Sequence, residues 1–60
     1  MKTREELEKE IAEKIETHDK WANVGDMHPS MRSEAGTEMA KLRAEIMGCR
    51  YEINALPNVV

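Results

Sequence analysis

Apolar side chains recur every three or four positions through the first third of the chain, as on one side of an amphipathic helix. Thr3 and Glu6 precede this stripe with the spacing of a capping box. On the other sides, three glutamates each stand four residues before a lysine, the favourable order for helical ion pairs. We therefore predict a helix over residues 3–22. Its apolar stripe comprises Leu7, Ile11, Ile15, His18 and Ala22.

The periodicity stops over residues 23–29, where we predict a turn. Gly25 supplies backbone freedom there, and Asp26 or Ser30 has a side chain suited to capping a following helix. Pro29 is compatible with the first turn of that helix, because its missing N–H has no helical partner at that position. The sequence therefore predicts two helices joined by a short connection.

The second helix is expected over residues 30–56, since Pro57 cannot continue it. At 1.5 Å per residue it would be about 40 Å long, against about 30 Å for the first helix. The tail of residues 58–60 contains two valines that we expect to pack against a neighbouring surface. The expected architecture is thus a hairpin with a longer second helix.

The second helix has two apolar sides. One is a heptad seam of the kind used in helix-on-helix packing; it comprises Ala35, Met39, Leu42, Ile46, Cys49, Ile53 and Leu56. The other comprises Ala40, Ala44, Met47, Tyr51 and Ala55. One chain supplies only one partner helix, so the second side calls for another copy. We predict an all-α helical hairpin that assembles into a helical-bundle homo-oligomer, a tetramer or a dimer.

Three arginines, Arg32, Arg43 and Arg50, lie within about 20° of one another between the two apolar sides. One interpretation is structural: their stems cover the seam and their guanidinium groups pair with glutamates of a neighbouring chain. The other is a binding site, because arginine suits bidentate phosphate contacts and stacking on planar rings. Tyr51 and Trp21, with His18 near the latter, are the candidate partners for the bases of a nucleotide. Both interpretations remain open at this point.

Composition excludes several other functions. Sixty residues make one domain at most, and the net charge of −3 argues against binding DNA or RNA polymers. No apolar run approaches the length of about 20 residues that a membrane span requires. His18, His28 and Cys49 lack the spacing of a zinc site, and a lone cysteine in a buried seam favours neither a disulfide nor nucleophilic catalysis. We expect a cytoplasmic protein with no metal, no cofactor and no enzymatic activity.

In size, hairpin architecture and expected self-assembly, the chain resembles the small anti-CBASS sponges of bacteriophages, and the anti-CBASS 4 family in particular. The resemblance implies an oligomer that sequesters a cyclic nucleotide signal of the bacterial host's defence, in the host cytoplasm. The residues that would bind it are Arg32, Arg43, Arg50, Tyr51, Trp21 and His18. Two other classes compete with this one. A helical module could bind or inhibit a host protein through its acidic first helix, and a coiled-coil adaptor would be purely structural.

Overall fold

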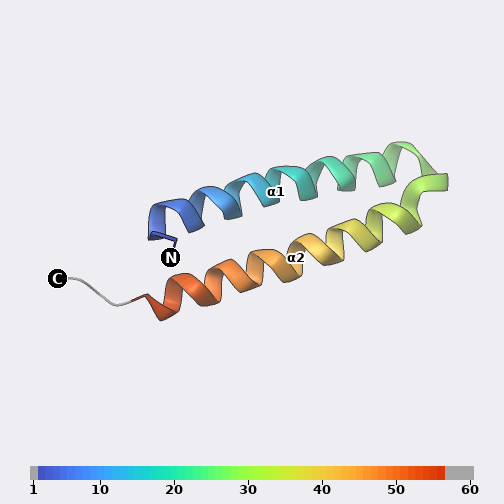
Figure 1. Cartoon of the computed structure of the whole chain (residues 1–60). Helices are drawn as coiled ribbons and strands as arrows, with labels where there is room; N and C mark the ends of the chain where they lie inside the picture. Colours follow the sequence, from blue (N-terminus) through green and yellow to red (C-terminus); the bar gives the residue numbers. More distant parts are fainter. Residues whose placement is uncertain (1, 57–60) are drawn as a thin grey trace.

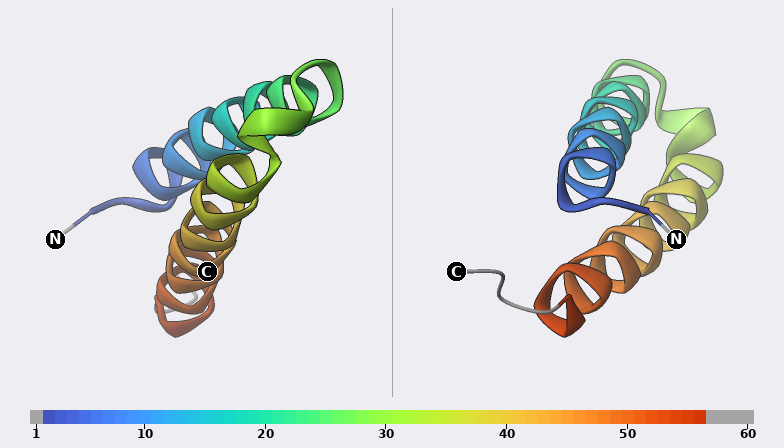
Figure 2. Two further views of the ribbon diagram at one scale, coloured as in Figure 1. Left: turned by 90° about the vertical axis from the view of Figure 1, so that its right-hand side faces the viewer. Right: turned by 60° about the vertical axis from the view of Figure 1, so that its left-hand side comes forward.

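The computed structural model describes residues 2–56 and shows two antiparallel helices joined at one end (Figure 1). Helix α1 spans Arg4–Met27, a short 3-10 helix η1 spans Pro29–Met31, and α2 spans Arg32–Ala55. The hairpin is elongated, with extents of 50 × 15 × 14 Å. Each helix contacts the other along one side and leaves its remaining sides bare (Figure 2). The predicted all-α hairpin is confirmed.

The predicted capping box starts α1. The Thr3 hydroxyl accepts a hydrogen bond from the Glu6 backbone N–H at 3.2 Å, and the Glu6 carboxylate accepts one from the Thr3 N–H at 3.3 Å. These bonds satisfy backbone donors that have no partner inside the helix. The first helix therefore begins where its sequence predicts.

The predicted end of α1 was wrong. The helix continues through the expected turn to Met27, and it includes Gly25 and Asp26 in ordinary helical conformation. Gly25 is buried because Ala35 of α2 packs against it: a Cβ added at Gly25 would lie 3.4 Å from the Ala35 Cβ. This close packing compensates for a helical glycine, which costs about 1 kcal/mol relative to alanine. Gly25 therefore allows α1 to pack closely against α2, and it does not form a turn.

The connection is correspondingly short, and it does not use the predicted caps. His28 ends α1, its N–H donating to the Val24 carbonyl at 2.9 Å, and Pro29 opens η1. Neither η1 nor α2 has a side-chain cap, so neither Asp26 nor Ser30 plays that role.

The second helix is not the longer one, since α1 and α2 have 24 residues each. Leu56 follows α2 with extended backbone, φ −67° and ψ 139°, the conformation favoured before a proline. The prediction for the tail of residues 58–60 lies outside the described residues.

The predicted seam of α2 is confirmed, because all seven of its residues are buried or half-buried. The helix α1 presents a slightly different stripe from the predicted one. Ile15 is 40% exposed, whereas Lys14 and Trp21 are half-buried. Leu7, Lys14 and Trp21 follow the seven-residue repeat of coiled-coil packing, while Ile11, His18 and Ala22 of the predicted stripe are also half-buried. Among the described residues, the buried apolar side chains are few: Leu7, Ala35, Ile46 and Cys49.

Candidate functional site: an arginine-lined groove

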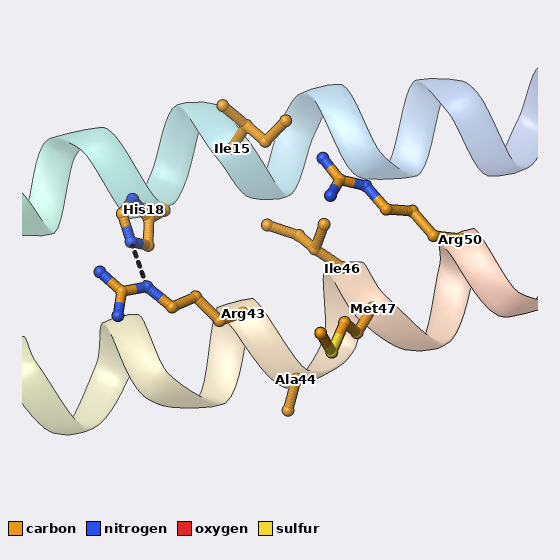
Figure 3. A pocket seen from close by; sticks show the side chains of 7 residues that line it. All are labelled: Ile15, His18, Arg43, Ala44, Ile46, Met47 and Arg50. Atoms are coloured by element: carbon orange, nitrogen blue, oxygen red, sulfur yellow. Dashed lines mark hydrogen bonds between the residues drawn. The ribbon is translucent and has the colours of Figure 1, made fainter.

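A groove of about 400 Å³ opens at the junction of α1 and α2, along one edge of the hairpin. Its walls come from the middle of α1 and from two turns of α2 (Figure 3). The lining residues are Ile15, His18, Arg43, Ala44, Ile46, Met47 and Arg50. The floor is therefore aliphatic, and the polar groups are two guanidinium groups and one imidazole.

Arg43 is held against α1 by a histidine. Its Nε donates a hydrogen bond to Nε2 of His18 at 3.2 Å (Figure 3). An acceptor nitrogen carries no proton, so this bond requires neutral imidazole with its proton on Nδ1. Nδ1 lies 3.4 Å from a carboxylate oxygen of Asp19, which suits that tautomer. The bond uses only Nε of the guanidinium and orients its remaining donors.

Arg50 completes the basic wall. Within residues 2–56 it has no ion pair or side-chain hydrogen bond, and the terminal amino groups of Arg43 have none either. The two arginines are two helical turns apart, about 10 Å along the axis. Within the part of the chain that the structure describes, no aspartate or glutamate lines the groove, although the sequence contains twelve of them. The protein is acidic overall, yet positive charge is concentrated around this apolar groove.

Of the six predicted site residues, the structure brings His18, Arg43 and Arg50 together and leaves the other three outside the groove. Arg32 lies at the connection, where its Nε donates to the Gly25 carbonyl at 3.4 Å. Trp21 is half-buried farther along α1, and Tyr51 is 69% exposed on the second apolar side of α2. Base stacking by Trp21 or Tyr51 of the same chain is therefore not supported by this groove.

The sequence reasoning missed the groove's apolar floor. Ile15 was assigned to the buried stripe and Ile46 to the seam, while Ala44 and Met47 were assigned to the second apolar side. Each assignment described one helix alone. A groove arises where the edges of two helices meet, and this meeting depends on their mutual rotation, which a single-helix pattern does not contain.

A second polar cluster crosses the seam toward the open end of the hairpin. Cys49 is buried, and its thiol donates to the Glu10 carboxylate at 2.8 Å. The same carboxylate accepts a hydrogen bond from the Lys2 ammonium. One turn along α1, Lys14 pairs with Glu45 of α2 at 3.1 Å. These contacts hold the two helices in register, and no spacing within either helix revealed them.

The Glu10 contact raises the pKa of the Cys49 thiol, and burial adds to the effect. It also lowers the pKa of Glu10, with Lys2 contributing. The thiol contact therefore stabilises the fold at neutral pH, and that stabilisation is lost as pH rises through the raised thiol pKa. The Glu10 contribution is lost instead as pH falls through the lowered carboxyl pKa.

We expect Glu10→Gln to shift the alkylation of Cys49 by iodoacetamide to lower pH. The thiolate is the reactive form, and this substitution removes the negative charge that opposes thiolate formation. The rate is measured against pH in native buffer, with Glu13→Gln as a control that removes an exposed charge from the same helix. Identical pH profiles for Glu10→Gln and the unsubstituted chain would contradict the assignment.

Residues 2–56 contain neither a metal-binding cluster nor a membrane-spanning helix. No three side chains of histidine, cysteine, aspartate or glutamate gather there as a metal site. Neither described helix combines the length and apolar character needed to cross a membrane. Comparison with protein-family models, curated proteins and solved structures finds no match to the chain.

Proposed function

We propose that this protein is a non-enzymatic binding protein for a small anionic ligand of the nucleotide class, held in the arginine-lined groove. The observation that carries the proposal is the composition of that groove: two arginines, one histidine and no acid over an aliphatic floor, in a chain of net charge −3. Such a site attracts anions and also removes apolar surface of a ligand from water.

A nucleotide matches both parts of the groove. Its phosphate accepts charge-assisted hydrogen bonds from the free guanidinium donors of Arg43 and Arg50. Its base or ribose covers Met47 and Ile15, and a guanidinium plane can stack on the base itself. Sequestration of a cyclic dinucleotide signal, the role that the resemblance to phage anti-CBASS sponges implies, requires binding of this kind and no chemistry.

Arg43→Ala and Arg50→Ala are each expected to weaken binding of cyclic di-AMP or cyclic di-GMP at least about tenfold, because a hydrogen bond to a charged group contributes about 1.5–3 kcal/mol. Isothermal titration calorimetry measures the affinity, and circular dichroism checks that each variant remains helical. The matched control is Arg32→Ala, which removes the same charge outside the groove and should leave the affinity nearly unchanged.

Two outcomes would overturn this proposal. Equal losses for Arg32→Ala and Arg50→Ala would show a general charge effect instead of a site. No heat with either cyclic dinucleotide or with AMP, from a folded protein, would favour the competing class, a module that binds a host protein through the acidic face of α1. The exposed acids of α1 are Glu5, Glu6, Glu8, Glu13, Glu16, Asp19 and Asp26.

A bound cyclic dinucleotide is expected to remain chemically intact. Among residues 2–56, no carboxylate or thiol lines the groove, and its histidine is engaged with Arg43, so these residues offer no activated nucleophile and no matched acid–base pair. Cyclic di-AMP incubated overnight with equimolar protein should be recovered unchanged on reversed-phase chromatography. A linear dinucleotide product whose amount scales with protein, and persists with Arg32→Ala but not Arg43→Ala, would contradict this expectation.

A further inference from the structure

Among the described residues that line the groove, His18 is the only side chain of a type that titrates near neutral pH. Its imidazole points from α1 toward Arg43 of α2, and its side chain is 21% exposed (Figure 3). Histidine in general changes its charge between about pH 5 and 8, whereas arginine stays charged throughout. The net positive charge of the groove therefore depends on the protonation of this one side chain.

Neutral His18 keeps part of Arg43 away from a ligand. Its Nε2 accepts the Nε–H of Arg43 at 3.2 Å, so one guanidinium donor is already used inside the protein. A guanidinium binds phosphate bidentately through two parallel N–H donors, and one of its two-donor edges includes Nε. In the neutral state that edge is occupied, and Arg43 offers a ligand only its terminal amino groups.

Protonation of His18 reverses the role of Nε2. An imidazolium carries protons on both ring nitrogens, so Nε2 donates a hydrogen bond and no longer accepts one. The contact with Arg43 then joins two cations 3.2 Å apart and must open, because like charges repel. One proton thus adds a positive charge, creates a new N–H donor and releases the Nε–H of Arg43. Each of these changes favours a bound anion.

The charged side chains around the imidazole come from both helices. They are Lys14 and Asp19 on α1, and Arg43, Glu45 and Arg50 on α2. Asp19 lies 3.4 Å from Nδ1 and favours the protonated ring, although its 74% exposure weakens the effect. The two arginines oppose protonation, while Lys14 and Glu45 pair with each other at 3.1 Å. Among the described residues, η1 contributes none to the groove lining.

We infer that His18 is a proton-dependent third anion contact of the groove, so that binding of a phosphate ligand is coupled to uptake of a proton by the imidazole. A bound phosphate places negative charge where the two arginines otherwise oppose that proton, so the two events favour each other. The coupling rests on the proposed function and states how the site is regulated. Affinity rises as pH falls through the range in which imidazole gains its proton, and levels off below that range.

Calorimetry with cyclic di-AMP measures the coupling. Phosphodiesters lack the second ionisation near pH 6 of a phosphate monoester, so a proton taken up must go to the protein. We expect affinity at least about tenfold tighter at about pH 5.5 than at about pH 8, the usual effect of a hydrogen bond to a charged group. At about pH 7, the observed heat should differ between buffers of different ionisation enthalpy, in the direction of proton uptake by the complex.

Two variants of His18 and one control assign the proton. His18→Gln retains a side-chain acceptor for Arg43 but takes up no proton, so its affinity should not change with pH. His18→Lys carries a permanent charge and should bind tightly at both pH values. The control is His28→Gln, which removes the chain's other histidine outside the groove and should preserve the pH dependence. Proton uptake that persists in His18→Gln would overturn the role of His18.

Nitrogen-15 NMR of the imidazole tests the Arg43 contact independently of affinity. Without ligand at about pH 8, where histidine is neutral, His18 should carry its proton on Nδ1 and none on Nε2. Addition of cyclic di-AMP at about pH 6 should protonate both nitrogens. A proton on Nε2 in the ligand-free protein at the higher pH would overturn the hydrogen bond. An imidazole that stays neutral in the complex would overturn proton uptake.

The binding data separate failure of this coupling from failure of the proposed function. Circular dichroism at both pH values checks the fold. We expect it to persist, because the lowered pKa of Glu10 and the raised pKa of Cys49 keep their contact intact across this range. If cyclic di-AMP binds with the same affinity at both pH values and without proton uptake, the role of His18 is wrong and the proposed function stands. If neither cyclic di-AMP nor cyclic di-GMP binds the folded protein at either pH, both are overturned.

Discussion

Leu7→Ala is expected to unfold most of the hairpin at room temperature. Leu7 is 1% exposed and is the largest fully buried side chain of the described residues. Truncation of a buried leucine costs about 2–5 kcal/mol through lost burial and a remaining cavity. A core this small rarely supplies more than about 3–5 kcal/mol in total. The loss should therefore consume most of the stability.

Urea titration followed by circular dichroism measures this effect at a fixed protein concentration, since self-association would otherwise alter the apparent midpoint. Ile15→Ala is the matched control, because Ile15 lies on the same helix with 40% of its surface exposed. We expect that variant to lose clearly less stability than Leu7→Ala. Equal losses at the two positions would mean that the hairpin does not pack around Leu7 as the structure shows.

Gly25→Leu is expected to destabilise the closed end of the hairpin by about 1–3 kcal/mol, the usual cost of overfilling a packed contact. A Cβ at Gly25 already reaches the Ala35 side chain at 3.4 Å and that of Arg32 at 3.9 Å. Further carbon atoms would push α1 and α2 apart. Gly25→Ala places only that Cβ there and gains about 1 kcal/mol of helix propensity, so it should be tolerated.

The control for Gly25→Leu is Gly48→Leu, because nothing lies within 4 Å of a Cβ added at Gly48. Both substitutions introduce the same side chain into a helix, and they differ in what surrounds it. Thermal or urea unfolding should rank Gly48→Leu well above Gly25→Leu. The reverse order would show that α1 does not continue through residue 25 in contact with α2.

Substitutions at groove residues and at core residues are expected to change different properties, ligand binding and folding respectively. Ile46 belongs to both, since it is 9% exposed in the seam and also forms part of the groove floor. Arg43 and Arg50 reach the groove from the exposed edge of α2, so their substitution should change binding more than folding. His18 connects the groove with the packing of the helices, because its hydrogen bond with Arg43 holds this arginine of the groove against α1.

Much of the hairpin could be predicted from local patterns. The capping box of Thr3 and Glu6, the heptad seam of α2 and the helix stop before Pro57 each depend on residues within a few turns of one another. The helical period fixes which side chains share a side, whatever the helix packs against. The common direction of Arg43 and Arg50 follows from the same arithmetic, and this part of the site was predicted.

The end of α1 could not be predicted in this way. Gly25, Asp26 and Pro29 together indicate a turn by every local criterion, yet α1 continues to Met27. The deciding contact joins Gly25 to Ala35, which lies on the other helix. Local propensities of about 1 kcal/mol are readily overcome by packing of this kind. With α1 extended to Met27, the two helices have 24 residues each.

The sequence by itself determined the helical class, the start of α1, the buried side of α2 and the arginine edge, because each depends on the 3.6-residue repeat of one helix. Only the tertiary structure decided which groups meet between helices: Arg43 with His18, Cys49 with Glu10, and the aliphatic floor beneath the two arginines. Those contacts depend on the register and rotation of α1 against α2. Register and rotation are set by the packing of side chains far apart in the chain, and no periodicity of a single helix encodes them.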